Sequence, residues 1–349
     1  MKLLENFLAE LREASAAEVK RYEAELLTPL FTHGWQEPRT DSQGRTRNSP
    51  VAAETRPSSL RGVLRYWWRA VNRADRITDL QNKEKRLFGG TGDAARKSPV
   101  SLRIFPYVAE RNNRIPLRPH RNETPVLAIS RGKNLTIELV RLRQVASENM
   151  ESLVFYDSLM KLFFCLGSMG QRARRGTGAL QWKGFVWSSV SDFQNSLRES
   201  LDGLHVGRNF SFPSLAAGSG GRGLPWPVKV LEMREQPSDY RGVNQRPLLL
   251  NVWVGQPYDD PEGARKAISQ AASQCNPPNV PGRRQLLGAV LGGRLSSPLW
   301  CTVRKIGNKY HPVVSELHNR HLSGRDREDY LKARNDFLKC LSPQQAGRR

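Results

Sequence analysis

Residues 153–166 read LVFYDSLMKLFFCL, residues 167–180 read GSMGQRARRGTGAL, and residues 181–187 read QWKGFVW. The first run is the most apolar helical pattern of the chain and predicts a buried helix that ends at Gly167. The glycine-rich run predicts a loop, because glycine permits backbone conformations that a helix or a strand excludes. The last run predicts a strand, so this part of the chain is expected to form a helix, a loop and a strand.

The residues that precede this stretch predict the rest of one domain. Alternation of apolar and polar residues predicts the strands. Leu60, Leu64, Trp67 and Val71 fall on one face of a helix, which Ser58 and Ser59 open, with serine as the N-cap. Strand, helix, strand, strand, helix, strand is the order of the split βαβ, or ferredoxin-like, fold. The predicted elements are strand 25–31, helix 58–76, strands 100–108 and 135–142, helix 153–166 and strand 181–187.

The flanking regions predict a second domain and an added helix. Residues 2–20 have an amphipathic helical pattern, and we expect three units at 1–24, 25–187 and 188–349. Gly307 and Asn308 lie between two strand patterns, as in a β-hairpin. The second unit is predicted to be an α+β domain with helices 193–204, 262–274 and 325–341 and strands 228–233, 248–254, 299–306 and 309–314.

The charge of the chain indicates a polyanionic partner. The 349 residues include 55 Lys and Arg against 33 Asp and Glu, a formal net charge of +22, and 41 of the basic residues are Arg. Residues 28–184 carry +15 of this excess. Arginine binds phosphate through two parallel hydrogen bonds and stacks on bases, although a GC-rich genome would also favour Arg over Lys. No apolar run is long enough to span a bilayer, Glu5 and Glu10 interrupt any export signal, and no P-loop is present, which favours a cytoplasmic protein.

The helix predicted at 58–76 carries a basic face. Arg61, Arg65, Arg69, Arg73 and Arg76 gather opposite its apolar side, with Asp75 as the one acid of the segment. Exposed helices usually mix both signs of charge, so a phosphate backbone would explain this face better than solvent alone. Trp68 falls at the border of the basic face, where it is predicted to stack on a base.

Two loops are the other candidate RNA-binding segments. The glycine-rich loop holds Arg172, Arg174 and Arg175 between Gly170 and the pair Gly176 and Gly178, which lets backbone and guanidinium groups approach one ligand. The polar stretch 35–57 is too long for a passive connection and contributes Arg39, Arg45 and Arg47. The alternative for the glycine-rich loop is a basic surface turn without a ligand.

Catalytic and metal signals are weak. His33 ends a predicted strand beside the loop that holds Asp41, so the two could act together in RNA cleavage, or they could merely line the loop. His318 and His321 lack nearby cysteine or paired acids, and the four cysteines lie far apart. We therefore expect no catalytic residue, no metal and no cofactor.

Several motifs resemble one family. The segments are Thr28–Gly34 (TPLFTHG), Ser58–Ala70 (SSLRGVLRYWWRA), Leu87–Gly90 (LFGG) leading to Ser98–Val100, Gly170–Gly178 (GQRARRGTG) and Arg294–Leu299 (RLSSPL). Together they resemble the RAMP proteins of CRISPR systems, and most closely the first RAMP subunit of the type III-B (Cmr) effector complex. The resemblance extends in patches over residues 25 to 310.

The resemblance implies two tandem ferredoxin-like modules that are similar to RNA-recognition motifs. It implies a non-catalytic subunit that lies near the 3′ end of the guide RNA, contacts neighbouring RAMP subunits and helps to capture target RNA. Two other hypotheses stay open, namely an endoribonuclease that acts through His33 or Asp41 and a general nucleic-acid-binding protein unrelated to CRISPR. The first hypothesis predicts that replacing Arg65 and Arg69 weakens RNA binding and flattens its salt dependence.

Overall fold

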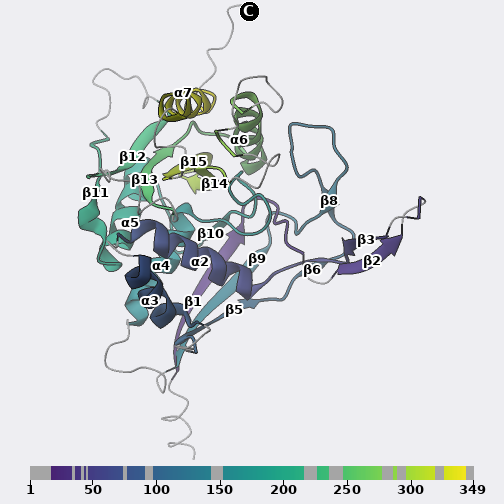
Figure 1. The fold of residues 1–349 in the computed structure, drawn as a ribbon, viewed down its shortest axis with the longest axis horizontal. Coiled ribbons are helices and arrows are strands. Elements are labelled where there is room, and N and C mark those ends of the chain that lie inside the picture. Colours follow the sequence, from purple (N-terminus) through teal and green to yellow (C-terminus); the bar gives the residue numbers. More distant parts are fainter. Residues whose placement is uncertain are drawn as a thin grey trace, which may run out of the picture.

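The structure is a computed structural model. It describes residues 17–33, 36–40, 43–44, 46–73, 77–90, 97–142, 152–215, 226–235, 247–276, 286–288, 296–318 and 326–342. Two larger antiparallel sheets, of four and five strands, lie within this part of the chain beside three two-stranded ones, and Figure 1 shows helices between and around the larger sheets. The buried apolar residues of both sheets form one continuous core.

The first sheet has the strand order β10-β1-β9-β5. Its strands are β1 (Ala17–Leu26), β5 (Val100–Phe105), β9 (Asn134–Leu142) and β10 (Leu180–Trp182), and all neighbours pair antiparallel. Side chains alternate between the two faces, so that Val100, Leu102 and Ile104 are buried. The expected order of strand, helix, strand, strand, helix, strand is therefore present in this sheet and its helices.

Three helices belong to the first sheet. They are α2 (Pro57–Val71), α3 (Ile77–Phe88) and α4 (Leu153–Leu166), and α2 and α4 pack on the sheet and on each other. Helix α4 has the predicted bounds, with Ser152 as its N-cap. Helix α2 begins at Pro57, one residue earlier than predicted, because proline is favoured in the first turn of a helix. Arg56 occupies the N-cap position and makes no side-chain capping hydrogen bond. It also ends earlier than predicted, at Val71.

The second sheet has the order β11-β12-β13-β15-β14. The predicted hairpin is confirmed, with Gly307 at a φ of 61° in its turn. The strands are β11 (Phe210–Ser211), β12 (Val228–Met233), β13 (Leu249–Val254), β14 (Leu299–Ile306) and β15 (Lys309–Leu317). The helices are α5 (Val190–Gly203), the short η2 (Gly207–Asn209), α6 (Pro261–Gln274) and α7 (Asp326–Lys339), of which α6 packs on β14, β15 and α7.

Strand β14 joins the two halves of the molecule. The Trp300 indole donates to the Ser168 hydroxyl at 3.0 Å, and the Arg304 Nε donates to the Cys165 carbonyl at 2.9 Å. Arg304 also donates to the carbonyls of Phe163 and Gly167, so one buried guanidinium satisfies the carboxyl end of α4. Burial lowers the pKa of Arg304 to about 9. The second sheet therefore contributes a cap to the central helix of the first.

The N-terminal prediction is wrong where the structure describes it. Residues 17–20 belong to strand β1 rather than to a helix, and the remainder of 2–20 lies outside the described residues. The first strand thus begins at 17 and not at 25. Tyr22, Ala24 and Leu26 are buried while Arg21 and Glu23 are exposed, which is the two-residue period of a strand paired with β9.

The stretch 35–57 contains strands that were not predicted. β2 (Gln36–Thr40) and β3 (Thr46–Pro50) form a hairpin that projects from the body of the molecule in Figure 1. Pairing continues in β4 (Ala53–Glu54) with β6 (Ala109–Glu110), and in β7 (Arg114–Ile115) with β8 (Val126–Leu127). Strands β6, β7 and β8 belong to the long connection between β5 and β9, which we call the excursion between β5 and β9. This segment contacts α6.

Candidate nucleic-acid interface

The arginines of helix α2 have an acidic partner that lies on helix α3. The Nε atoms of Arg65 and Arg69 lie 3.1 and 3.4 Å from the two carboxylate oxygens of Glu84. Arg65 also donates to the Gly89 carbonyl at 2.6 Å. The expectation that this basic face lacks acidic partners is therefore wrong, because α3 packs against α2 and places the acid beside the arginines.

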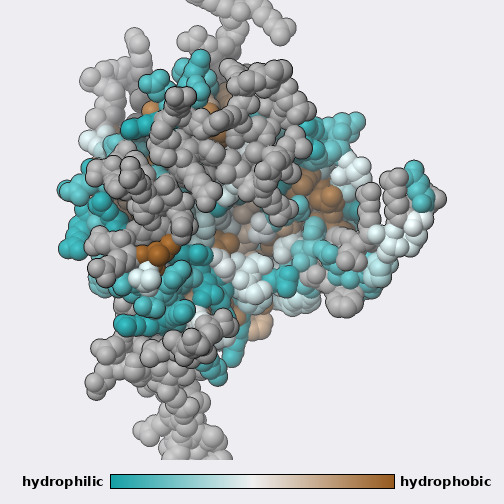
Figure 2. Space-filling view, in the orientation of Figure 1, coloured by the Kyte–Doolittle hydropathy of each residue, from teal (hydrophilic) through white to brown (hydrophobic). Residues whose placement is uncertain are grey.

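The ends of the same basic face differ from its centre. Arg73 lies beyond the end of α2, and its Nη1 is 3.4 Å from the exposed carboxylate of Glu235. Arg61 is half-buried, and Arg76 lies outside the described residues. Hydrophilic side chains cover the region of α2 and α3 (Figure 2). Much of the charge of this surface is thus neutralised within the protein.

Trp68 does not lie at a free surface. It is 2% exposed, and its ring packs against that of Phe88 with 6.3 Å between the centroids. The predicted stacking of Trp68 on a base is therefore wrong, since the side chain fills the core between α2 and α3. A helical wheel placed it at the border of the basic face and could not include the helix that covers it.

The glycine-rich loop between α4 and β10 packs tightly against the second half of the molecule. Gly176 and Gly178 adopt φ values of 79° and 63°, which side chains rarely tolerate. A Cβ atom on Gly176 would lie 2.9 Å from Ile268 of α6, and the Gly176 amide donates to the Cys301 carbonyl at 2.9 Å. These glycines permit a close contact between backbones within the protein.

Two of the three loop arginines hold the two halves of the molecule together. Arg174 donates to the Ser297 carbonyl at 2.5 Å and lies over the rings of Tyr66 and Trp300, at 4.9 and 5.2 Å from their centroids. Arg175 donates to the Leu287 carbonyl at 2.5 Å, and burial lowers its pKa. Their predicted contacts with RNA are therefore replaced by contacts with the second half of the chain.

Arg172 is the loop arginine that remains available. Its backbone is left-handed, with a φ of 58°, and among the residues that the structure describes its guanidinium has no hydrogen-bond or ion-pair partner. Its pKa is lowered to about 10, chiefly by burial and then by the positive charges of Arg175, Arg118 and Arg121, while the carboxylate of Glu123 opposes the shift. Arg172 thus lies among several positive charges that Glu123 offsets only in part.

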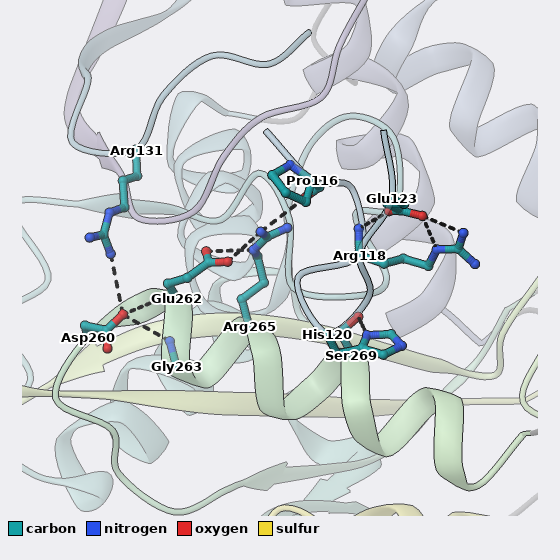
Figure 3. A network of polar contacts seen from close by, with 10 residues as sticks. All are labelled: Pro116, Arg118, His120, Glu123, Arg131, Asp260, Glu262, Gly263, Arg265 and Ser269. Atoms are coloured by element: carbon teal, nitrogen blue, oxygen red, sulfur yellow. Dashed lines mark hydrogen bonds and ion pairs between the residues drawn. The ribbon is translucent and has the colours of Figure 1, made fainter. Parts of the chain in front are cut away.

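The excursion between β5 and β9 supplies basic residues that the sequence analysis missed. The Nδ1 of His120 lies 2.7 Å from the Ser269 hydroxyl on α6, and Arg121 donates to Ser273 at 3.2 Å. Arg118 forms an ion pair with Glu123, whose carboxylate also accepts the Arg118 amide (Figure 3). The sequence signal that pointed to these residues was a series of arginines at 111, 114, 118, 121 and 131, which lie outside every predicted helix and strand.

The β2–β3 hairpin places two of its predicted arginines in register. Arg39 pairs with Arg47 across the strands, while Arg45 lies outside the described residues. The hairpin that carries these predicted residues is separate in space from α2 (Figure 1).

The catalytic alternative receives no geometric support from the described residues. The Nε2 of His33 lies 3.1 Å from the Leu127 carbonyl, and the His33 carbonyl accepts a hydrogen bond from Arg56. Asp41 and His321 lie outside the described residues, and His318 is buried. Within the described ranges, no group of three His, Cys, Asp or Glu residues is placed to hold a metal ion, and no helix is long and apolar enough to cross a membrane.

Comparisons with known proteins agree with the resemblance seen in the sequence. Residues 23–181 match the family profile of the RAMP superfamily, and no curated protein matches the chain. The crystal structure of apo Cmr1 from Pyrococcus furiosus is similar with a TM-score of 0.54 and 18% identity, over 93% of this chain and 97% of that one.

Chains from two cryo-EM structures of the Type III-B Cmr-beta, each bound to cognate target RNA, are also similar. The TM-scores are 0.56 and 0.55, with 12% identity in both, over 92% of this chain and 99% of theirs. The second of these structures also contains AMPPnP and was determined in the presence of ssDNA. At these identities the likeness describes the fold, which extends over nearly the whole chain.

Proposed function

We propose that this protein is a subunit of a type III-B CRISPR (Cmr) effector complex, because residues 23–181 match the RAMP superfamily profile and 93% of the chain shares the fold of Cmr1. Its partners in this role are guide RNA, target RNA and the neighbouring RAMP subunits, in the cytoplasm. The likeness to Cmr1 over 93% of one chain and 97% of the other carries the proposal, since both halves of the molecule share it.

Both halves are proposed to be ferredoxin-like modules. The order β12-β13-β15-β14 of the second sheet parallels the order β10-β1-β9-β5 of the first. In each, the chain leaves an inner strand, passes through a helix to the far edge and returns to the other inner strand. The second half differs because β12, which pairs with β13 on one side and with β11 on the other, precedes β13 along the chain, whereas β10 follows β1.

The role within the complex is proposed to be RNA binding without catalysis. Arg172, with Arg118 and Arg121 beside it, offers guanidinium groups to phosphate, and Arg39, Arg45, Arg47, Arg61 and Arg73 are further proposed contacts. Cleavage would require a positioned base or a metal ion. Of the two candidates for that chemistry, the ring of His33 is hydrogen-bonded to the Leu127 carbonyl. This bond favours a structural role for His33.

Purification of the full chain from its own host tests the assignment. We expect guide RNA with CRISPR-repeat sequence and other RAMP subunits to co-purify. RNA without repeat sequences and without RAMP partners would instead favour a general nucleic-acid-binding protein.

Incubation of the purified protein with labelled guide and target RNA tests the absence of catalysis. We expect both RNAs to be bound and to stay intact. Cleavage products that disappear in the His33→Ala or Asp41→Asn variant would favour the endoribonuclease.

A further inference from the structure

Two segments that are far apart in the sequence meet beside helix α6. The glycine-rich loop packs against α6 where Gly176 faces Ile268, and the excursion between β5 and β9 is bonded one residue further along the helix, where His120 meets Ser269. Figure 3 shows this excursion lying along α6. We name Arg118, His120, Arg121 and Arg172 the α6 cluster.

Two groups of the α6 cluster, Arg121 and His120, are fixed in place by neutral partners. Arg121 donates through Nη2 to Ser273 and through Nε to the His120 Nε2 at 3.3 Å. The ring of His120 is then neutral, with its Nδ1 donating to Ser269. Hydroxyl groups and a neutral imidazole orient the guanidinium without cancelling its charge.

The nearby acids are already paired with other groups. Glu123 binds Arg118 through both its side chain and its amide. On α6, Glu262 pairs with Arg265, and Asp260 pairs with Arg131 at 3.6 Å (Figure 3). Glu123 also offsets part of the charge of Arg172, but in the described part of the chain no acid forms a hydrogen bond or an ion pair with Arg121 or Arg172. The mutual repulsion of these charges would be relieved by a bound anion.

We propose that the α6 cluster binds a phosphodiester group of an RNA strand, with Arg121 and Arg172 as its principal ligands and Arg118 beside them. This proposal rests on the proposed RNA-binding function and assigns that function to one place in the fold. A guanidinium group presents two parallel N–H donors that match two phosphate oxygens, and the cluster gathers such groups from two separate segments. Because both halves of the molecule build it, the site exists only when the halves are assembled.

Equilibrium binding of a labelled single-stranded RNA, measured at several salt concentrations, tests this site. We expect the R121Q/R172Q variant to bind about tenfold more weakly at low salt, since charge-assisted hydrogen bonds to phosphate are lost. We also expect the slope of log K against log salt to flatten by about 0.7, the value for one contact with a single strand. Glutamine retains polar reach, so the fold is preserved, and thermal unfolding of the variant checks this.

The matched control is R21A/R103A, which removes two exposed arginines from the open face of the first sheet, where both contact Glu138. We expect the control to bind RNA as the wild type does. An equal loss of RNA affinity in the control would show that the effect depends only on the net charge of the protein, and it would overturn the site. Wild-type binding by R121Q/R172Q would overturn the site and leave the proposed function standing, whereas a wild-type protein that binds no RNA would overturn the proposed function.

Discussion

The arginines of helix α2 and those of the α6 cluster have similar charge and opposite surroundings. On α2, Arg65 and Arg69 share the carboxylate of Glu84, so a residue of the next helix forms ion pairs with both guanidinium groups and offsets part of their charge. At the α6 cluster, Arg121 is held by a serine and a neutral histidine, and Arg172 has no partner among the described residues. A cluster of basic residues therefore indicates a ligand only when the folded chain leaves some of its guanidinium groups without an acidic partner.

The largest effect on stability is expected from replacing Arg304, whose buried guanidinium donates hydrogen bonds within the protein. Arg304→Met would leave buried carbonyls at the end of α4 without donors, and we expect a loss of about 3 kcal/mol of unfolding free energy. Urea denaturation of this variant and of Arg208→Met, which changes an exposed arginine, measures the difference. A loss of similar size at both positions would contradict the capping role of Arg304.

The second prediction removes the acid that distinguishes the two regions. Glu84→Gln would leave Arg65 and Arg69 uncompensated, and we expect stability to fall by about 1 kcal/mol, because these groups are partly exposed. RNA affinity is expected to rise, since two freed guanidinium groups would attract phosphate. The control is Glu235→Gln, which removes the exposed partner of Arg73. Unchanged stability and affinity in Glu84→Gln would show that the pairing has no effect in solution.

The third prediction revises what the sequence suggested for α2. Because Arg65 and Arg69 are paired with Glu84, we expect R65A/R69A to lower the melting temperature and to leave the salt dependence of RNA binding unchanged. Melting and RNA titration of the same preparation separate the two effects. A flatter salt dependence of RNA binding in this variant, without a loss of stability, would show that helix α2 contacts the RNA and would contradict this prediction.

The smallest expected effect concerns His120. Its pKa is lowered by burial and by the nearby Arg121, Arg118 and Arg172, while Glu123 opposes them weakly. A phosphate bound there would favour the charged ring, so RNA should raise this pKa. Linkage then requires RNA affinity to increase as the pH falls below about 6.5, the ordinary value for histidine.

NMR of labelled histidine rings, with and without RNA, measures the pKa of His120 directly. His205 is exposed and lies on the turn after α5, so it serves as the internal control. Equal shifts of both rings, or no shift of His120, would contradict a phosphate beside it.

Local patterns were sufficient to predict many elements of the fold. Helix α4 and the hairpin turn at Gly307 were predicted from continuous apolar residues and from a turn dipeptide, which depend on neighbours in the sequence. Strand β1 was misplaced because its outward face carries charges, and its pairing with β9 joins residues more than a hundred positions apart. The sequence pattern contained no information about that pairing.

The candidate site was predicted less well, for the same physical reason. The exposure of Trp68, Arg174 and Arg175 is decided by α3 and by the second sheet, which cover them after folding. Arg172 was named correctly as a residue of the loop, yet its neighbours Arg118 and Arg121 come from the excursion between β5 and β9. Charge and spacing in the sequence identify the basic segments, whereas only the folded structure shows which acids lie beside them.

Photocrosslinking of RNA to the wild-type protein tests most directly whether RNA meets the α6 cluster or helix α2. A single strand that carries 4-thiouridine would be crosslinked, and the adducts mapped by mass spectrometry. We expect adducts on peptides that contain residues 114–123 and 171–175. Adducts confined to residues 61–73, with none beside α6, would contradict the account.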